Sequence, residues 1–257
     1  MMPNNRTVNE IKVKLKEIDD PEDSFIQACF ADERKGVKRA LEQWQRRQEA
    51  KKELRNRYER MSYHEMKAKD AGYQLIAGID EVGRGPLAGP VVSAAVILDE
   101  KEPILGLDDS KKLSLRKREE IFLEIQKKAL AIGIGRVDAK GIDQYNILGA
   151  TKLAMEEAVR KLPTGADFLL VDAVHLNNEI PAEVMNQGDS KSNSIAAASI
   201  VAKVTRDKMM NDYDALYPGY GFKKNAGYGT REHLDGLKKQ GPSSIHRYSF
   251  APVRKYS

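Results

Sequence analysis

The sequence predicts an α/β protein with a mixed sheet, preceded by a small helical extension. Three strand-like apolar runs come first and helices then alternate with strands, as expected for a mixed sheet with helices packed on it. The composition also changes near Gly72. Residues 1–70 are rich in charged residues and contain a single glycine, Gly36, whereas the remainder of the chain is rich in glycine and alanine. We therefore expect a helical extension over 1–71 and a main domain over 72–257.

The strongest helix signal in the extension runs from about Val37 to Met61. Apolar residues recur at i, i+3 or i+4 over most of this segment, and lysines and arginines occupy its other face. A solvated helix that docks its apolar stripe on another element would explain the pattern. A basic face that helps to hold nucleic acid would also explain it, so both interpretations stay open.

The main domain carries clear strand and helix signals in sequence order. Strands are predicted at 74–80, 91–98, 131–137 and 168–171. Helices are predicted at about 114–130, 141–162 and 194–213, the first with Ser114 as its N-cap. The last of these helices is rich in alanine and serine, which lets a helix pack closely against a sheet. A short helix with Thr230 as its N-cap begins a C-terminal helical region.

Composition excludes several classes of protein. The longest largely apolar stretch, 91–98, is far shorter than the roughly 20 residues of a membrane helix, and no signal-peptide pattern opens the chain. Cys29 is the single cysteine, which excludes an internal disulfide and a cysteine-built zinc site. We expect a cytoplasmic location and, by default, a monomer. A net charge of +5 permits a polyanionic partner without requiring one.

Four acidic residues are candidates for chemistry. Asp80 and Glu81 close an apolar strand. Asp172 closes another, and Asp189 lies just before the alanine-rich helix. Each acid taken singly is more often a helix cap or a turn residue. Brought together they would repel one another, and a divalent cation with oxygen ligands, magnesium or manganese, would relieve that repulsion.

A glycine-rich loop, Gly83 to Pro90, follows the first pair of acids. Three glycines in seven residues let the backbone approach a ligand closely and expose its N–H groups. The loop lacks the Gly-Lys-Ser/Thr ending of a phosphate-binding P-loop. A tight turn without a ligand would explain it equally well.

Together these segments strongly resemble the motifs of bacterial ribonuclease HII. The first motif is Gly-Ile-Asp-Glu-Val-Gly-Arg-Gly-Pro-Leu-Ala-Gly-Pro-Val-Val at 78–92. The others follow in order at 109–114, 170–173, 188–192, 194–207, 224–230 and 246–250. Each motif alone is weak, but the ordered set covers nearly all of 72–253 and has a very low chance of arising by accident.

The resemblance implies an RNase H-like fold and a metal site formed by four acids, Asp80, Glu81, Asp172 and Asp189. It implies hydrolysis of RNA paired with DNA, and incision 5′ of a lone ribonucleotide in duplex DNA, leaving 3′-hydroxyl and 5′-phosphate ends. Such an activity would serve ribonucleotide removal and RNA primer removal. Two cations roughly 3.5–4 Å apart can activate a water and stabilise the departing oxygen in such a reaction.

The resemblance also implies a set of substrate contacts. The loop Gly83-Arg84-Gly85 matches the element that recognises the ribose 2′-hydroxyl, largely through backbone groups. Tyr228 matches the tyrosine that stacks on the sugar after the ribonucleotide. Lys111 and Lys112 are expected to contact phosphates, with Ser110 donating a hydrogen bond beside them.

One position departs from the family pattern. Gln187 stands where the family usually has a lysine, directly before the Gly-Asp of the fourth acid. Loss of that positive charge would weaken a phosphate contact or slightly raise the pKa of Asp189. Because all four acids are present, we still expect an active enzyme.

Three alternatives stay open from the sequence. The sister family, ribonuclease HIII, shares the fold and prefers longer RNA tracts, but Tyr228 and the helical extension favour ribonuclease HII. A catalytically silent module that binds hybrids would require the loss of an acid. A structural protein acting through the basic helix would lose its whole function on deletion of residues 1–70.

Overall fold

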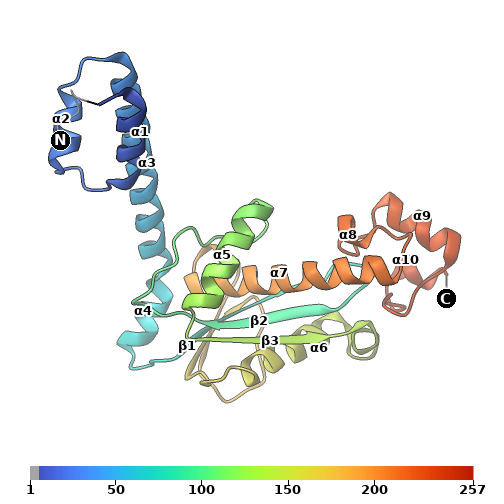
Figure 1. Ribbon diagram of the computed structural model, residues 1–257. Helices are drawn as coiled ribbons and strands as arrows, with labels where there is room; N and C mark the ends of the chain where they lie inside the picture. The colour runs from blue at the N-terminus through green and yellow to red at the C-terminus, as the bar shows by residue number, and fades with distance from the viewer. Residues whose placement is uncertain (1–5, 257) are drawn as a thin grey trace. The chain divides into compact units, whose positions relative to one another are not determined.

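The charged segment at the start of the chain folds as helices. The computed structural model describes residues 6–256, and it divides them into two compact units, one ending at Arg57 and the other beginning at Tyr58. The first unit contains α1 (Val8–Glu17), α2 (Ser24–Phe30) and most of α3 (Lys35–Met61), shown in blue in Figure 1. The capping box of α1 satisfies its first backbone N–H groups: Thr7 accepts from the amide of Glu10, and Glu10 accepts from that of Thr7.

The first unit has a small core of its own. Val37, Leu41 and Trp44 of α3 pack against buried residues of α1 and α2. The indole Nε1 of Trp44 donates a hydrogen bond of 2.7 Å to the carbonyl oxygen of Ile18, which satisfies the polar atom of a buried aromatic side chain. Docking of the apolar stripe is therefore confirmed for the first half of α3.

Within residues 6–256 the strands form one five-stranded sheet in the order β3-β2-β1-β4-β5. The strands are β1 (Ile76–Val82), β2 (Val91–Ile97), β3 (Ala131–Val137), β4 (Phe168–Asp172) and β5 (Ala182–Met185). The first three pair antiparallel, whereas β4 pairs parallel with β1 and β5 parallel with β4. The predicted mixed sheet is confirmed. The short edge strand β5 was not predicted, because its half-exposed Ala-Glu-Val-Met sequence has no apolar run.

Helices cover both faces of this sheet (Figure 1). On one face lie α5 (Leu115–Lys128) and α7 (Asn193–Leu216), and on the other lies α6 (Ala139–Arg160). Helix α7 passes so close to β1 that a Cβ on Gly78 would lie 2.0 Å from the carbonyl carbon of Ser194. The alanines of α7 between 196 and 202 are fully buried, which confirms the structural role predicted for this part of the helix.

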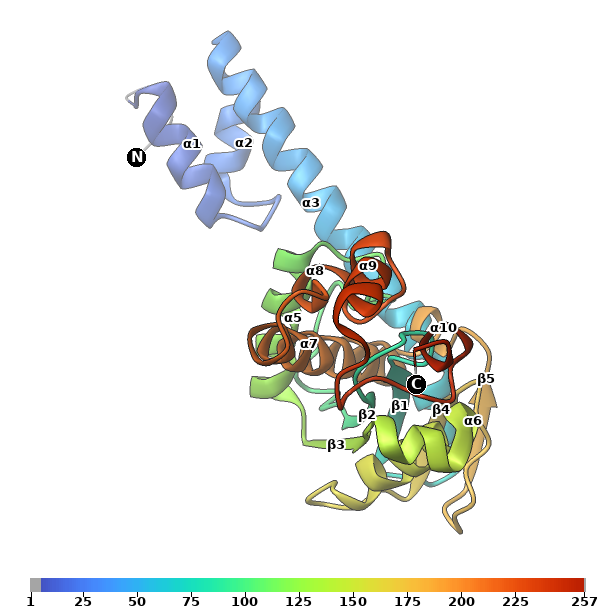
Figure 2. The same cartoon turned by 90° about the vertical axis from the view of Figure 1, so that its right-hand side faces the viewer.

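The remaining helices are short. They are α4 (Tyr63–Asp70), α8 (Phe222–Asn225), α9 (Arg231–Gln240) and α10 (Ala251–Arg254). The last three gather at the C-terminal end of α7 (Figure 1), and Figure 2 views the molecule from that end. The hydroxyls of Ser114 and Thr230 accept from the backbone of α5 and α9, which confirms both predicted N-caps. Within residues 6–256 no helix combines the length and hydropathy that crossing a membrane requires.

Candidate active site

Parallel pairing of β1 with β4 brings three of the predicted acids together. In this register Ile79 pairs with Val171, so the residues that follow each of them, Asp80 and Asp172, emerge at the same edge of the sheet. One oxygen from each of Asp80, Glu81 and Asp172 lies within 4.8 Å of the others. Three carboxylates at this separation are close enough to share a cation.

The negative charge of this cluster is only partly neutralised by neighbouring groups of the protein. Burial, followed by the neighbouring Glu81 and Asp172, raises the pKa of Asp80 well above its usual value. Burial also raises the pKa of Glu81, although Arg84 opposes this with a hydrogen bond of 3.2 Å from Nη1 to Oε1. The other oxygen of Glu81, Oε2, is buried and has no hydrogen-bond partner among the described atoms. The cluster therefore offers oxygen ligands that the protein leaves partly unsatisfied.

The fourth predicted acid, Asp189, lies in a single 3₁₀ turn, η2 (Gly188–Ser190), directly before α7. It is not one of the three acids of the tight cluster. The backbone N–H of Gly188 donates to Asp172 Oδ1 at 2.7 Å, so this turn is tied to the end of β4. Burial, followed by Asp109 and Asp172, raises the pKa of Asp189 to about 6, while Lys111 opposes the shift.

Two neighbours of Asp189 affect its pKa and its position. Asp109 was not singled out as a site residue, yet its carboxylate lies close enough to raise the pKa of Asp189. The only signal for it in the sequence is its position at the head of the Asp-Ser-Lys-Lys motif. Gln187 is exposed and has a left-handed backbone conformation with φ of 57°, which orients the turn that carries Asp189.

Arg247 fixes the glycine-rich loop from within the protein. Its guanidinium is fully buried and donates to the carbonyl oxygens of Gly83, Arg84 and Gly89 over distances of 2.6–3.0 Å. Gly83 has a φ of 94°, and a Cβ there would lie 2.3 Å from Nε of Arg206. Both the conformation and the space therefore require glycine at this position.

Arg206, from the middle of α7, holds the end of the same loop. It donates to the carbonyl oxygens of Ala88, Pro90 and Ala226 at 2.9–3.1 Å. Burial lowers the pKa of Arg206 to about 10 and that of Arg247 to about 9, so both stay charged at neutral pH. Neither role was predicted from the sequence, since an arginine in a motif does not show that backbone carbonyls are its partners.

Tyr228 lies beside the loop with its ring at the surface. It is 47% exposed, and a Cβ on Gly85 would touch its ring at 3.4 Å. The carbonyl oxygen of Tyr228 accepts from Nδ1 of the buried His233 at 2.9 Å. His233 Nε2 in turn accepts from Nε2 of His246, because His246 Nδ1 already accepts from the N–H of Ser243. A chain of neutral, hydrogen-bonded histidines therefore holds the backbone of Tyr228.

The Ser-Lys-Lys segment is part buried and part exposed. Ser110 is only 3% exposed, and its hydroxyl oxygen accepts from Ser199 of α7 at 3.0 Å. Lys111 and Lys112 are exposed, and the charge of Lys111 lowers the pKa of both Glu81 and Asp189. The structure therefore places Lys111 near the acids and Ser110 beneath it, as an anchor between this segment and α7.

Comparison with known proteins identifies the family. Residues 77–253 match the family model for ribonuclease HII, and residues 7–69 match the model for the ribonuclease HII N-terminal domain. The chain belongs to the ribonuclease HII family. Ribonuclease HII of Enterococcus faecalis is 53% identical over 248 residues, covering 96% of this chain and 97% of that protein. Ribonuclease HII of Bacillus subtilis is 51% identical, covering 98% of this chain and 99% of that protein.

Solved structures agree with the ribonuclease HII assignment. The crystal structure of ribonuclease H2 from Pyrococcus horikoshii has a TM-score of 0.62 at 27% identity, covering 71% of this chain and 97% of that chain. Ribonuclease HII from Archaeoglobus fulgidus, solved in a complex with PCNA, has a TM-score of 0.59 at 26% identity, covering 69% of this chain and 95% of that chain. The predicted RNase H-like fold is confirmed.

The family decides the class of activity. A ribonuclease HII is an endoribonuclease that hydrolyses the RNA of RNA–DNA hybrids with the help of a divalent metal ion. The predicted enzyme and its nucleic-acid substrate are therefore confirmed. The alternatives of a silent binding module and of a purely structural protein are set aside. Ribonuclease HIII is set aside as well, because the family models and the relatives are those of ribonuclease HII.

Proposed function

We propose that this enzyme also incises duplex DNA on the 5′ side of a single embedded ribonucleotide, leaving 3′-hydroxyl and 5′-phosphate ends. The observation that supports this most is the 83–85 loop, which follows the acids Asp80 and Glu81 along the chain and has the ring of Tyr228 beside its Gly85. A recognition loop next to one group of catalytic carboxylates can contact one ribose at a time, so recognition does not require a long RNA tract.

The donor set fits divalent cations. The acids offer only oxygen ligands, which magnesium and manganese prefer, and Glu81 Oε2 is a buried oxygen with no hydrogen-bond partner among residues 6–256. We assign the cation, manganese or magnesium, to Asp80, Glu81, Asp172 and Asp189. A pair of such cations, when bound, supplies activation of the attacking water and charge stabilisation for the departing oxygen.

The remaining residues would position the substrate. With the carbonyls of Gly83 and Arg84 engaged by Arg247, the loop can turn its backbone N–H groups toward the ribose 2′-hydroxyl. The exposed ring of Tyr228 beside Gly85 would stack on the following deoxyribose. Lys111 would contact a phosphate close to the acids.

Three other residues complete the proposed substrate surface. The exposed side chain of Arg84 lies next to Glu81, and the exposed side chain of Lys112 lies next to Asp108. Both would contact phosphates, which set the register of the duplex without reading its sequence. Ser110 would act by holding the Lys111-Lys112 segment on α7, since its hydroxyl faces Ser199 rather than solvent.

We infer that the enzyme works in the cytoplasm as a monomer, in ribonucleotide removal and RNA primer removal. We also propose that residues 1–71 are a helical extension and residues 72–257 the catalytic domain. The separate family matches, to 7–69 and 77–253, support this division.

The test is cleavage of a DNA duplex that carries one ribonucleotide, with magnesium, manganese or a chelator. We expect one cut on the 5′ side of the ribonucleotide in the presence of either metal and none with the chelator. Asp80→Asn should reduce the rate by several orders of magnitude, because it removes a central carboxylate of the cluster. The same variant should melt at an equal or higher temperature in chelator, because the buried carboxylate repulsion is relieved.

Asp235→Asn on α9 is the matched control, since that side chain is 71% exposed. It should cut at the wild-type rate. Wild-type cleavage by Asp80→Asn would refute the assignment of the metal site. Cleavage of long hybrids without any cut at a single ribonucleotide would refute the proposed substrate.

A further inference from the structure

The first turn of α7 is tied to the turn that carries Asp189. Ser192 is the N-cap of α7, and its hydroxyl accepts from the backbone N–H of Ile195 at 3.2 Å. The backbone N–H of Ser192 donates to the carbonyl oxygen of Gly188 at 2.8 Å. Gly188 also packs so closely on this helix that a Cβ there would lie 2.6 Å from Cδ1 of Ile195. The position of the η2 turn therefore depends on where the first turn of α7 is held.

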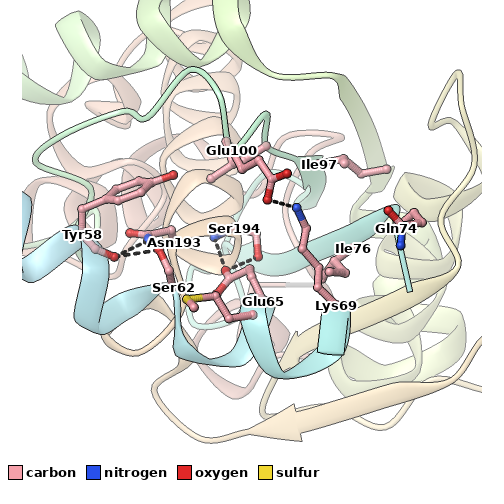
Figure 3. A pocket seen from close by; sticks show the side chains of 12 residues that line it. Tyr58, Ser62, Glu65, Lys69, Gln74, Ile76, Ile97, Glu100, Asn193 and Ser194 are labelled. Carbon is pink, nitrogen blue, oxygen red and sulfur yellow. Dashed lines mark hydrogen bonds and ion pairs between the residues drawn. The ribbon is translucent and has the colours of Figure 1, made fainter. Parts of the chain in front are cut away.

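Glu65 of α4 holds this first turn. Figure 3 shows its carboxylate in contact with Ser194. Its Oε1 accepts from the hydroxyl of Ser192 at 2.6 Å, and from the backbone N–H and the hydroxyl of Ser194 at 2.9 and 2.7 Å. The N–H of Ser194 is one of the four that the start of an α-helix leaves without a partner within the helix. A carboxylate is also stabilised at this end of the helix dipole, so Glu65 acts as a cap for α7.

A second contact joins the same turn to the end of α3. Nδ2 of Asn193 donates to the carbonyl oxygen of Tyr58 at 2.8 Å and to the hydroxyl oxygen of Ser62 at 2.9 Å (Figure 3). Asn193 is only 2% exposed, so these hydrogen bonds are shielded from water. The segment that contains the end of α3 and α4 therefore fixes the start of α7 through two separate side chains.

The hydrogen bonds continue from η2 to the acids of the candidate metal site. The backbone N–H of Gly188 donates to Asp172 Oδ1 at 2.7 Å, while its carbonyl oxygen accepts from Ser192. Glu65 and Asp172 are thus connected through only two residues, Ser192 and Gly188. A displacement of the first turn of α7 would move Gly188 relative to Asp172, and it would move Asp189 with it.

We propose that Glu65 is a positioning residue for the metal site. By capping α7 it holds the η2 turn where Asp189 can share a cation with the three acids of the tight cluster. Ser192 and Ser194 are fully buried, so removal of Glu65 would leave their donors without the acceptor that they share and would drive the turn to rearrange.

This inference rests on the proposed assignment of the cation to four acids, Asp189 among them. It adds a role for a residue outside the segment that matches the ribonuclease HII model, since Glu65 lies within the 7–69 match to the N-terminal domain. The helical extension would then contribute to the metal site through α4, with no contact of its own to the cation.

The experiment is a calorimetric titration of the full-length protein with manganese chloride, in the absence of nucleic acid. Glu65→Ala should weaken manganese binding about tenfold, because loss of a group that orients metal ligands costs about ten- to a hundredfold in metal affinity. On a hybrid duplex, kcat of this variant should fall at low manganese and return to the wild-type value at saturating manganese, with KM for the duplex unchanged. A folded variant that is only less stable would show neither effect.

Two variants serve as controls. Glu65→Gln should recover most of the manganese affinity, because its amide oxygen can still accept from the same three donors. Glu183→Ala removes a different carboxylate that contacts α4, through His64 and Lys67, and that makes no contact with the start of α7. It should lower the Tm and leave the manganese affinity unchanged.

A folded Glu65→Ala that binds manganese as tightly as the wild type would overturn the proposal, as would a Glu65→Gln that loses as much affinity as Glu65→Ala. Should Glu65→Ala fail to fold, Glu65→Asp takes its place, since it keeps the charge but is one methylene too short to reach the three donors. Unchanged affinity in that variant would equally overturn the proposal.

Asp189→Asn separates this inference from the metal assignment on which it rests. If Asp189→Asn binds manganese as tightly as the wild type, the assignment of the cation to Asp189 fails, and the role of Glu65 fails with it. If Asp189→Asn loses affinity while Glu65→Ala does not, the metal assignment stands and only the role of Glu65 is refuted.

Discussion

Replacing Arg247 by lysine should loosen the glycine-rich loop without removing a charge. The Arg247 guanidinium donates four hydrogen bonds to three carbonyl groups, those of Gly83, Arg84 and Gly89. A lysine ammonium is a compact point donor and cannot reproduce a planar fork that reaches carbonyls on several sides. We expect Arg247→Lys to keep about two of the four hydrogen bonds.

The magnitude follows from the two bonds that are lost. A hydrogen bond from a charged donor contributes about 1.5–3 kcal/mol, so the free energy of unfolding should fall by about 3–6 kcal/mol. At about 2–4 °C per kcal/mol for a protein of this size, the Tm should drop by about 6–24 °C. A loop displaced by about 1 Å should also lower kcat/KM on a single embedded ribonucleotide by about a hundredfold.

Two assays test this prediction. Thermal unfolding measures the loss of stability, and kcat/KM on a duplex with one ribonucleotide measures the loss of loop geometry at a temperature where the variant stays folded. Arg231→Lys on α9 is the control, because its side chain is 96% exposed and the change should stay within about 0.5 kcal/mol. Wild-type Tm and kcat/KM for Arg247→Lys would refute the positioning role of this arginine.

Three further predictions concern separate parts of the molecule. Tyr228→Ala should reduce kcat/KM about ten- to hundredfold at a single ribonucleotide and by less within a long RNA tract, and Tyr228→Phe should have a smaller effect. Equal losses on both substrates would show that the ring does not recognise the junction between the ribonucleotide and the following deoxyribonucleotide. Burial and then His233 lower the pKa of His246 from 6.5 to about 4, so the neutral ring contributes stability above pH 6.5 that is lost as the pH falls toward 4, by about 3 kcal/mol. His246→Gln should therefore flatten the acid limb of the unfolding free energy in urea titrations at pH 4–7, and an unchanged limb would contradict the assignment. Deleting residues 1–57 should leave a folded enzyme whose duplex binding is weaker and less dependent on salt. Deleting residues 1–70 should also lower the Tm, because α4 belongs to the second unit. Equal Tm values for the two deletions, or an unchanged salt dependence of binding, would contradict this prediction.

Local patterns in the sequence determined much of this protein. Strand and helix periodicity predicted the mixed sheet, and the polar residues before each helix predicted the N-caps at Ser114 and Thr230. The order of the motifs indicated the family. The periodicity and the N-cap signals can be recognised in the sequence because they depend on residues only a few positions apart along the chain.

Tertiary structure alone decided which distant groups meet. The register of β1 on β4 brings Asp80 to Asp172, which lies 92 residues further along the chain. The side chain of Arg247 reaches carbonyls more than 150 residues away, and Glu65 of α4 caps α7. Each of these contacts depends on how complete elements pack, and a buried polar group is satisfied or left unpartnered only by that packing.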